Sequence, residues 1–198
     1  MSREVITGAT AVGLIFKDGV ILAAEKRMTY GRFITAKGVK KVFKITDKVG
    51  AACAGWMADM QEIMRRVKHI VKLKEMEENR PLSVNSIAKL TSVLLFQNRL
   101  YPLMTQVIVG GYVRGPQVYS LDPLGSIVRD KFVATGSGGE IAMGVLEAGY
   151  REELSKEEAK NLALNSIKAA IRRDAISGDG IDSLIIDING AEEESIIF

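Results

Sequence analysis

The order of strand-like and helix-like segments restricts the fold of this 198-residue chain more than any other feature. Three hairpins are predicted, each from two apolar or alternating runs separated by turn residues: 11–16 with 20–24, 41–45 with 49–54, and 107–112 with 117–121. Further strand character covers residues 127–133, and residues 183–188 form the last predicted strand. Because the first hairpin is continuously apolar, both of its strands are expected to be buried on two faces.

Between and after these strands, apolar residues recur at steps of three and four, which predicts amphipathic helices. Four helices are expected, from residue 57 to the Arg80-Pro81 break, from Ser83 to a point before Pro102, over 141–150, and over about 156–175. Ser155 and Glu158 form a capping box for the last helix. The final eight residues, which include Glu192, Glu193 and Glu194, are expected to be loose.

The resulting order is strands, two helices, strands, two helices and a strand, without βαβ alternation. Such an order favours antiparallel sheets covered by paired helices, because parallel neighbours need a crossover connection. We therefore predict an α+β fold, a four-layer α-β-β-α sandwich in a single domain. With 47% hydrophobic and 26% charged residues, the chain has the composition of a packed globular protein.

Charge and hydropathy argue against two classes of protein. The 27 basic and 24 acidic residues are interspersed, so the sequence gives no case for nucleic-acid binding. No apolar run approaches the roughly 18 residues that a membrane span requires, and no signal peptide follows Met1. A cytoplasmic protein without a membrane partner is expected.

Cysteine and histidine usage limits the chemistry further. Cys53 is the only cysteine and His69 the only histidine, so one chain forms neither an internal disulfide nor a Cys/His zinc site. His69 lies in a basic helical stretch, off the apolar face, as expected of a solvated side chain. If the chain is a hydrolase, we expect its base to be a group other than imidazole.

Several motifs together resemble a known family. They are G-A-T-A-V-G at 8–13, K-D-G-V-I-L-A-A-E-K-R at 17–27, A-G at 54–55, V-G-G-Y at 109–112, Y-S-L-D-P at 119–123, A-T-G-S-G at 134–138 and R-D-A-I-S-G-D-G-I-D at 173–182. In this order, over nearly the whole chain, they resemble a proteasome β subunit of the archaeal type. The resemblance implies an N-terminal-nucleophile hydrolase, a threonine-type endopeptidase with the sandwich fold inferred above.

The family pattern also implies a processing site. A short propeptide ends in glycine and is removed autocatalytically, which exposes a threonine whose hydroxyl is the nucleophile. Here the propeptide corresponds to Met1–Gly8, the mature domain to residues 9–198, and the nucleophile position is occupied by Ala9. Threonine suits this chemistry because a free α-amino group, with a pKa of about 8, can shuttle the hydroxyl proton without histidine.

Neither neighbouring threonine is expected to replace the missing oxygen. Side chains alternate across a strand, so the Thr10 hydroxyl should point away from the site that Ala9 faces. Thr7 has the parity of Ala9 but lies about 6.6 Å upstream, within the segment expected to be removed. As it stands, the chain is predicted to be inactive and unprocessed.

The remaining site residues follow from the resemblance, position by position. The catalytic set corresponds to Glu25, Lys41, Gly55 through its backbone N–H, Ser137, Asp174 and Ser177. The Thr29 backbone corresponds to the edge that aligns the peptide substrate as an added strand. Met28, Val39, Cys53 and Met57 correspond to the lining of an apolar pocket, which implies cleavage after large hydrophobic residues.

Each of these residues alone has an ordinary explanation, for example a solvated Lys41 or a surface Glu25; as an ordered set they favour an active site. Two functions remain open: a threonine peptidase with Ala9 introduced in place of threonine, which the retained set favours, or a naturally non-catalytic structural β subunit. A phosphate-binding enzyme is a weak third reading, because the T-G-S-G-G turn lacks the Lys-Ser/Thr of a P-loop.

By resemblance, the partners are proteasome α subunits and other β subunits in stacked seven-membered rings and, through them, an unfolding ATPase. The substrates implied are peptides and unfolded proteins. The chemistry implied requires no metal or organic cofactor.

Overall fold

Continuous apolar runs place the first hairpin at the centre of the fold. The computed structural model describes residues 8–198, and in it β1 (Thr10–Phe16) pairs antiparallel with β2 (Gly19–Glu25), as predicted. Every residue of β2 is buried. Burial on both faces requires a packed layer on each side of this hairpin.

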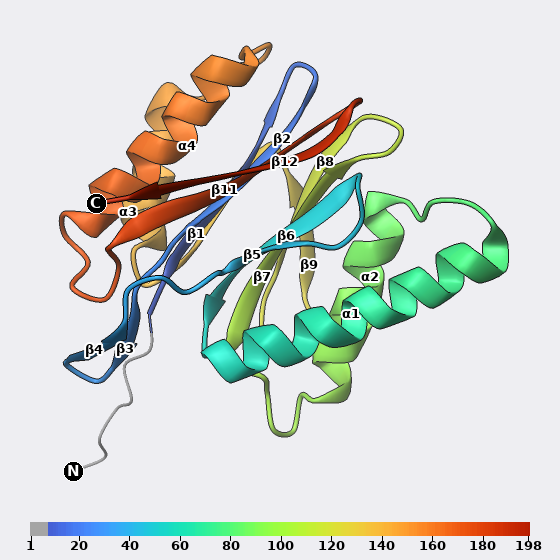
Figure 1. Cartoon of the computed structure of the whole chain (residues 1–198), viewed down its shortest axis with the longest axis horizontal. Coiled ribbons are helices and arrows are strands. Elements are labelled where there is room, and N and C mark those ends of the chain that lie inside the picture. The colour runs from blue at the N-terminus through green and yellow to red at the C-terminus, as the bar shows by residue number, and fades with distance from the viewer. Residues whose placement is uncertain (1–7) are drawn as a thin grey trace.

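Two five-stranded antiparallel sheets face each other (Figure 1). The first has the strand order β10 (Phe132–Gly136), β1, β2, β11 (Gly180–Asp187) and β12 (Gly190–Ile197). The second has the order β5 (Val42–Lys44), β6 (Val49–Gly55), β7 (Thr105–Tyr112), β8 (Pro116–Leu121) and β9 (Ile127–Asp130). A small hairpin, β3 (Met28–Tyr30) and β4 (Phe33–Ala36), follows β2.

A pair of helices covers the outer face of each sheet (Figure 1). Helices α1 (Met57–Glu78) and α2 (Val84–Gln97) lie on the second sheet, and α3 (Gly139–Gly149) and α4 (Lys156–Ile171) on the first. Ser83 caps α2, and Ser155 and Glu158 form the capping box of α4, both as predicted. The predicted four-layer α-β-β-α sandwich is confirmed.

Side-chain alternation along β1 divides the core into layers. Val12 and Leu14 pack with α3 and α4, whereas Ala9 and Ala11 pack in the layer between the two sheets. A third apolar layer fills the space between the second sheet and helices α1 and α2. Because neighbours on a strand point to opposite faces, Ala9 and Thr10 belong to different layers.

The expectation that the last eight residues are loose is wrong. All of them except Phe198 belong to β12, which pairs with β11 from Gly190 to Ile197. Each residue of the acidic run has a lysine partner: Glu192 with Lys156, Glu193 with Lys40, and Glu194 with Lys160. Because these lysines come from distant segments, the acidic run taken by itself predicts a solvated tail.

Two further element bounds differ from prediction. Residues 127–133 do not form one strand: β9 pairs with β8 in the second sheet and β10 with β1 in the first, so the chain changes sheets at Lys131. Helix α4 ends at Ile171 rather than near residue 175. The Asp174 carboxylate accepts the backbone N–H of Ile176 at 3.2 Å, a local bond that competes with further helix.

Across residues 8–198, no helix has the length and apolar character needed to cross a membrane.

Candidate active site

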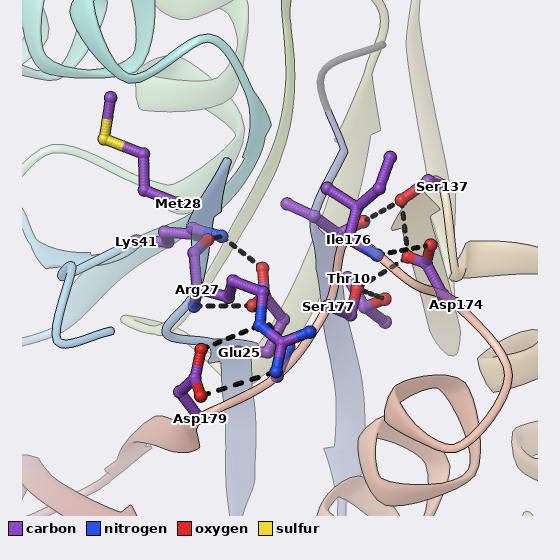
Figure 2. A network of polar contacts seen from close by, with 12 residues as sticks. Thr10, Glu25, Arg27, Met28, Lys41, Ser137, Asp174, Ile176, Ser177 and Asp179 are labelled. Atoms are coloured by element: carbon purple, nitrogen blue, oxygen red, sulfur yellow. Dashed lines mark hydrogen bonds and ion pairs between the residues drawn. The ribbon is translucent and has the colours of Figure 1, made fainter. Parts of the chain in front are cut away.

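The ends of β2 and β5 bring a carboxylate and an ammonium group together. Glu25 is the last residue of β2 and Lys41 directly precedes β5; their side chains are 0% and 2% exposed and form an ion pair (Figure 2). Lys41 Nζ also donates to the Arg27 carbonyl oxygen at 2.5 Å. The second Glu25 oxygen accepts the backbone N–H groups of Arg27 at 2.7 Å and Gly178 at 3.0 Å. The predicted Glu25–Lys41 pairing is therefore present in the structure.

Burial governs the ionisation of this pair. It raises the pKa of Glu25 and lowers the pKa of Lys41, and their mutual attraction opposes both shifts. The donors around Glu25 favour its carboxylate form. A lysine with a lowered pKa releases its proton more readily than a solvated lysine, which is a property of lysines that take part in acid–base chemistry.

A second polar cluster lies beside the first and centres on Asp174 (Figure 2). One Asp174 oxygen accepts the hydroxyls of Ser137 at 2.6 Å and Ser177 at 2.7 Å. The Ser137 hydroxyl is also 3.4 Å from the Ala9 carbonyl oxygen. The structure thus brings three predicted site residues together next to Ala9.

Ala9 and Thr10 point in opposite directions, as strand parity predicts. The Ala9 methyl is fully buried in the layer between the sheets, together with Val42 and Ala54. Thr10 therefore points away from the face that Ala9 occupies, as predicted, but its hydroxyl lies 2.8 Å from the Ser177 hydroxyl, a contact with a predicted site residue that was not expected. Since Ser177 uses its proton on Asp174, Thr10 is the donor in this bond. Strand alternation predicted the direction of the Thr10 side chain, but not its contact with Ser177 in the loop between α4 and β11.

Two glycines are fixed by close contacts around Ala9. A Cβ atom on Gly8 would lie 2.3 Å from Ser137 Oγ and 3.0 Å from a methyl of Ile176. Gly55 has a φ of 137°, and a Cβ atom there would lie 2.1 Å from the Met104 carbonyl oxygen. Both positions therefore exclude side chains, so the backbone can run close to its neighbours.

An apolar cavity of about 180 Å³ lies next to the Glu25–Lys41 pair. Its lining residues are Gly8, Arg27, Met28, Thr29, Tyr30, Lys41, Gly55, Trp56, Met57 and Ala58. Met28, Thr29 and Met57, predicted as substrate-binding residues, are among them. Tyr30 and Trp56 were not predicted; the single tryptophan directly after the A-G motif is the only sequence signal for Trp56.

Val39 and Cys53, predicted to line the same pocket, are not among its lining residues. Cys53 is fully buried under α1, because alternation along β6 turns it toward the helix layer while Ala52 and Ala54 face the other sheet. Burial raises the pKa of its thiol, so Cys53 is an unreactive core residue. Val39 is half-buried, and its backbone N–H donates to the Lys26 carbonyl oxygen at 3.0 Å.

A second cavity, of about 310 Å³, is lined by Ala9 itself. Gly8 and Gly55 line both cavities, and Ser137 lines the second. The Gly8–Ala9 peptide bond is therefore flanked by an apolar cavity, a second cavity and two polar clusters. Such convergence of a pocket and perturbed titratable groups is typical of an active site.

The Thr10 contact gives a first prediction. Thr10→Val keeps the shape of the side chain and removes the donor to Ser177, so we expect a loss of about 1–2 kcal/mol in the free energy of unfolding, measured with urea. The matched control is Thr91→Val. Thr91 is equally buried, but its hydroxyl donates to the Ile87 carbonyl oxygen at 2.8 Å within helix α2, so its loss should cost less. Equal losses of unfolding free energy in the two variants would contradict a specific contribution of the Thr10–Ser177 hydrogen bond to stability.

The four-layer sandwich, with a buried acid–base pair beside the start of its first strand, defines the class of N-terminal-nucleophile hydrolase folds. Comparison with family models gives the family within that class. Residues 5–186 match the model described as "Proteasome subunit", so the chain belongs to the proteasome subunit family.

Individual relatives agree with this assignment. "Proteasome subunit beta 1" of Ignicoccus hospitalis is 49% identical over 183 residues, which is 92% of each chain. "Proteasome subunit beta 2" of Pyrobaculum aerophilum is 48% identical over 197 residues, 99% of this chain and 97% of that protein. "Proteasome subunit beta 1" of Nitrosopumilus maritimus is 47% identical over 186 residues, 94% of each. The resemblance to archaeal proteasome β subunits is confirmed.

Proposed function

We propose that this chain is a β subunit of the proteasome core particle that cannot cleave peptides, because Ala9 occupies the position of the threonine nucleophile. One observation carries the proposal. Ala9 is buried in the layer between the sheets; Ser137 lies 3.4 Å from its carbonyl oxygen and is hydrogen-bonded to Asp174, but the alanine side chain supplies no reactive oxygen. The family to which the chain belongs generally consists of threonine peptidases.

The chemistry of the site would proceed from an oxygen on residue 9. Lys41, held by Glu25, would lower the pKa of that hydroxyl, and the freed α-amino group would take up its proton. Ser137, Asp174 and Ser177 would orient the amino group. The attacked carbonyl oxygen would receive the backbone N–H of Gly55.

Substrate binding would use the apolar cavity and its rim. A peptide would add as a strand along the backbone of Thr29 and place a large hydrophobic side chain between Met28 and Met57. With alanine at position 9, a peptide could still bind there but no acyl intermediate would form. The chain would then contribute to the structure of the ring and to subunit contacts rather than to catalysis.

In the cytoplasm, its partners would be proteasome α subunits and other β subunits of the same rings and, through them, an unfolding ATPase. Two origins fit a silent site. Retention of Glu25, Lys41, Ser137, Asp174 and Ser177 favours a recent or engineered exchange of threonine for alanine; a subunit that is naturally structural is the alternative. The codon for residue 9 in the native gene separates the two.

The intact mass of the chain tests the proposal in the assembled particle. We expect Met1–Gly8 to remain attached to Ala9, since no oxygen is present to attack the Gly8–Ala9 bond. An active β subunit in the same preparation, trimmed to its threonine, serves as the control for assembly. A mass that corresponds to loss of residues 1–8 would refute the proposal. Trimming of residues 1–7 by neighbouring subunits would leave the Gly8–Ala9 bond intact and would agree with the proposal.

A further inference from the structure

Arg27 contacts both members of the buried ion pair through its backbone. Its N–H donates to Glu25 at 2.7 Å, and its carbonyl oxygen accepts from Lys41 at 2.5 Å. The position of this one peptide segment therefore determines two of the bonds that hold the pair. It lies just beyond β2, where sheet pairing no longer fixes the backbone.

The Arg27 side chain ties this segment to the loop between α4 and β11 (Figure 2). Its Nε donates to Asp179 Oδ2 at 2.7 Å, a second guanidinium nitrogen lies 3.4 Å from Asp179 Oδ1, and the third donates to the Ala175 carbonyl oxygen at 3.1 Å. The hydrogen bonds between the two side chains, together with their opposite charges, raise the pKa of Arg27 and lower that of Asp179. Their side chains are 21% and 13% exposed, so solvent screens this pair only in part.

The same loop returns a bond to the ion pair. A Cβ atom on Gly178 would lie within 2.6 Å of three guanidinium atoms of Arg27, so the guanidinium lies directly against the Gly178 backbone. The Gly178 N–H donates to Glu25 at 3.0 Å. Asp179 itself has a φ of 66°, a left-handed conformation that aspartate tolerates better than most residues. Asp174 and Ser177 of the second polar cluster lie in this loop as well.

We propose that Asp179 is a positioning residue for the Glu25–Lys41 pair, acting through the Arg27 guanidinium. Asp179 touches neither member of the pair. By holding Arg27 against Gly178, it keeps two backbone N–H donors on Glu25 and one carbonyl acceptor on Lys41. It also fixes the first polar cluster relative to the second. The catalytic meaning of this role rests on the proposed function; the contacts themselves do not.

The chain offers a matched control one residue from the Arg27–Asp179 ion pair, which we call the clamp. Lys26 and Asp182 form a similar ion pair between the end of β2 and β11, at 2.5 Å, with side chains 12% and 11% exposed. Lys26 also donates to Ser195 at 3.1 Å, and neither charged group has a bond to Glu25 or Lys41. Asp182→Asn should therefore weaken the fold by an amount similar to Asp179→Asn without disturbing the site.

Amide NMR on the full chain tests the clamp without any activity. In Asp179→Asn we expect the Arg27 and Gly178 amide protons, both bonded to a carboxylate, to move upfield and to exchange at least about tenfold faster relative to core amides. Asp182→Asn should leave both shifts in place. The proposal would be overturned if the Arg27 and Gly178 amide shifts and exchange rates were unchanged in Asp179→Asn, or if they changed equally in the two variants. It would also be overturned if exchange accelerated uniformly for all amides. Should Asp179→Asn fail to fold, Arg27→Lys keeps the charge but loses the planar fork and should give the same local changes.

Activity provides the second arm. In a chain that also carries Ala9→Thr, we expect Asp179→Asn to lower kcat by about ten- to a hundredfold, because small displacements of catalytic groups have effects of this size. Asp182→Asn should change kcat less than twofold. An equal kcat in the two variants would contradict the positioning role. If Ala9→Thr alone is inactive, the proposed function fails, while the amide measurements still decide whether Asp179 holds the pair.

Discussion

Glu25→Leu is expected to destabilise the fold by about 3–5 kcal/mol, the cost of leaving one partner of a buried ion pair uncompensated. The size of the effect follows from what Glu25 accepts. Its two oxygens take the Lys41 ammonium and the backbone N–H groups of Arg27 and Gly178, and leucine replaces none of these bonds. The buried Lys41 ammonium would lose its counter-charge and keep only the Arg27 carbonyl oxygen, and the two backbone amides would lose their acceptor. Urea unfolding of the full chain measures the loss.

Lys41→Met should cost less than Glu25→Leu, although it breaks the same pair. Glu25 then keeps its two amide donors, and methionine fills the apolar path of the lysine stem. Without the ammonium, burial raises the pKa of Glu25 further above that in the unfolded chain. The deficit of the variant relative to the parent is therefore smallest at acid pH, grows once the pH exceeds the folded pKa of Glu25 in the parent, and becomes constant once the pH exceeds the folded pKa of Glu25 in the variant.

Unfolding at a series of pH values between 4 and 8 compares the two variants with the parent chain. A Lys41→Met deficit that equals that of Glu25→Leu at all pH values would show that the amide donors do not support the carboxylate. A deficit that grows toward acid pH would contradict the assignment of a buried, unpaired Glu25.

The layered fold could be predicted because each layer leaves a local trace in the sequence. The continuous apolar runs at 11–16 and 20–24 predicted a layer on both sides, and the three- and four-residue apolar steps after Met57 and Ser155 predicted helices. The period of two along β1 also predicted that Ala9 and Thr10 point to opposite faces. Motif order supplied the Glu25–Lys41 pair, whose members are 16 residues apart.

The features that could not be predicted depend on contacts between distant segments. Strand β12 is an acidic run that becomes an edge strand because Lys40, Lys156 and Lys160 meet it. The Thr10–Ser177 bond joins residues 167 positions apart, and the Arg27–Asp179 clamp joins residues 152 apart. All four residues lie within the motifs quoted above, but no periodicity or spacing in the sequence pairs them. Cys53 shows the converse error, since its motif position indicated a pocket while strand alternation places it under a helix.

The central claim is that the site around residue 9 is complete except for one oxygen, and Ala9→Thr tests it in the assembled particle. Threonine would add a hydroxyl in the layer between the sheets, beside the cavity that Ala9, Gly55 and Ser137 line. We expect autocatalytic loss of Met1–Gly8. Hydrolysis of a fluorogenic peptide with a large hydrophobic residue before the scissile bond should rise on the order of a thousandfold or more over background, the scale on which a nucleophile acts.

The control variant combines Ala9→Thr with Lys41→Met, which keeps the new hydroxyl but removes its activating group and should show neither processing nor hydrolysis. The decisive measurement is peptide hydrolysis, with the intact mass of the chain, by particles that contain Ala9→Thr and otherwise inactive β subunits. Removal of eight residues together with hydrolysis agrees with the account. A fully assembled particle in which Ala9→Thr keeps those eight residues and cleaves nothing would contradict it.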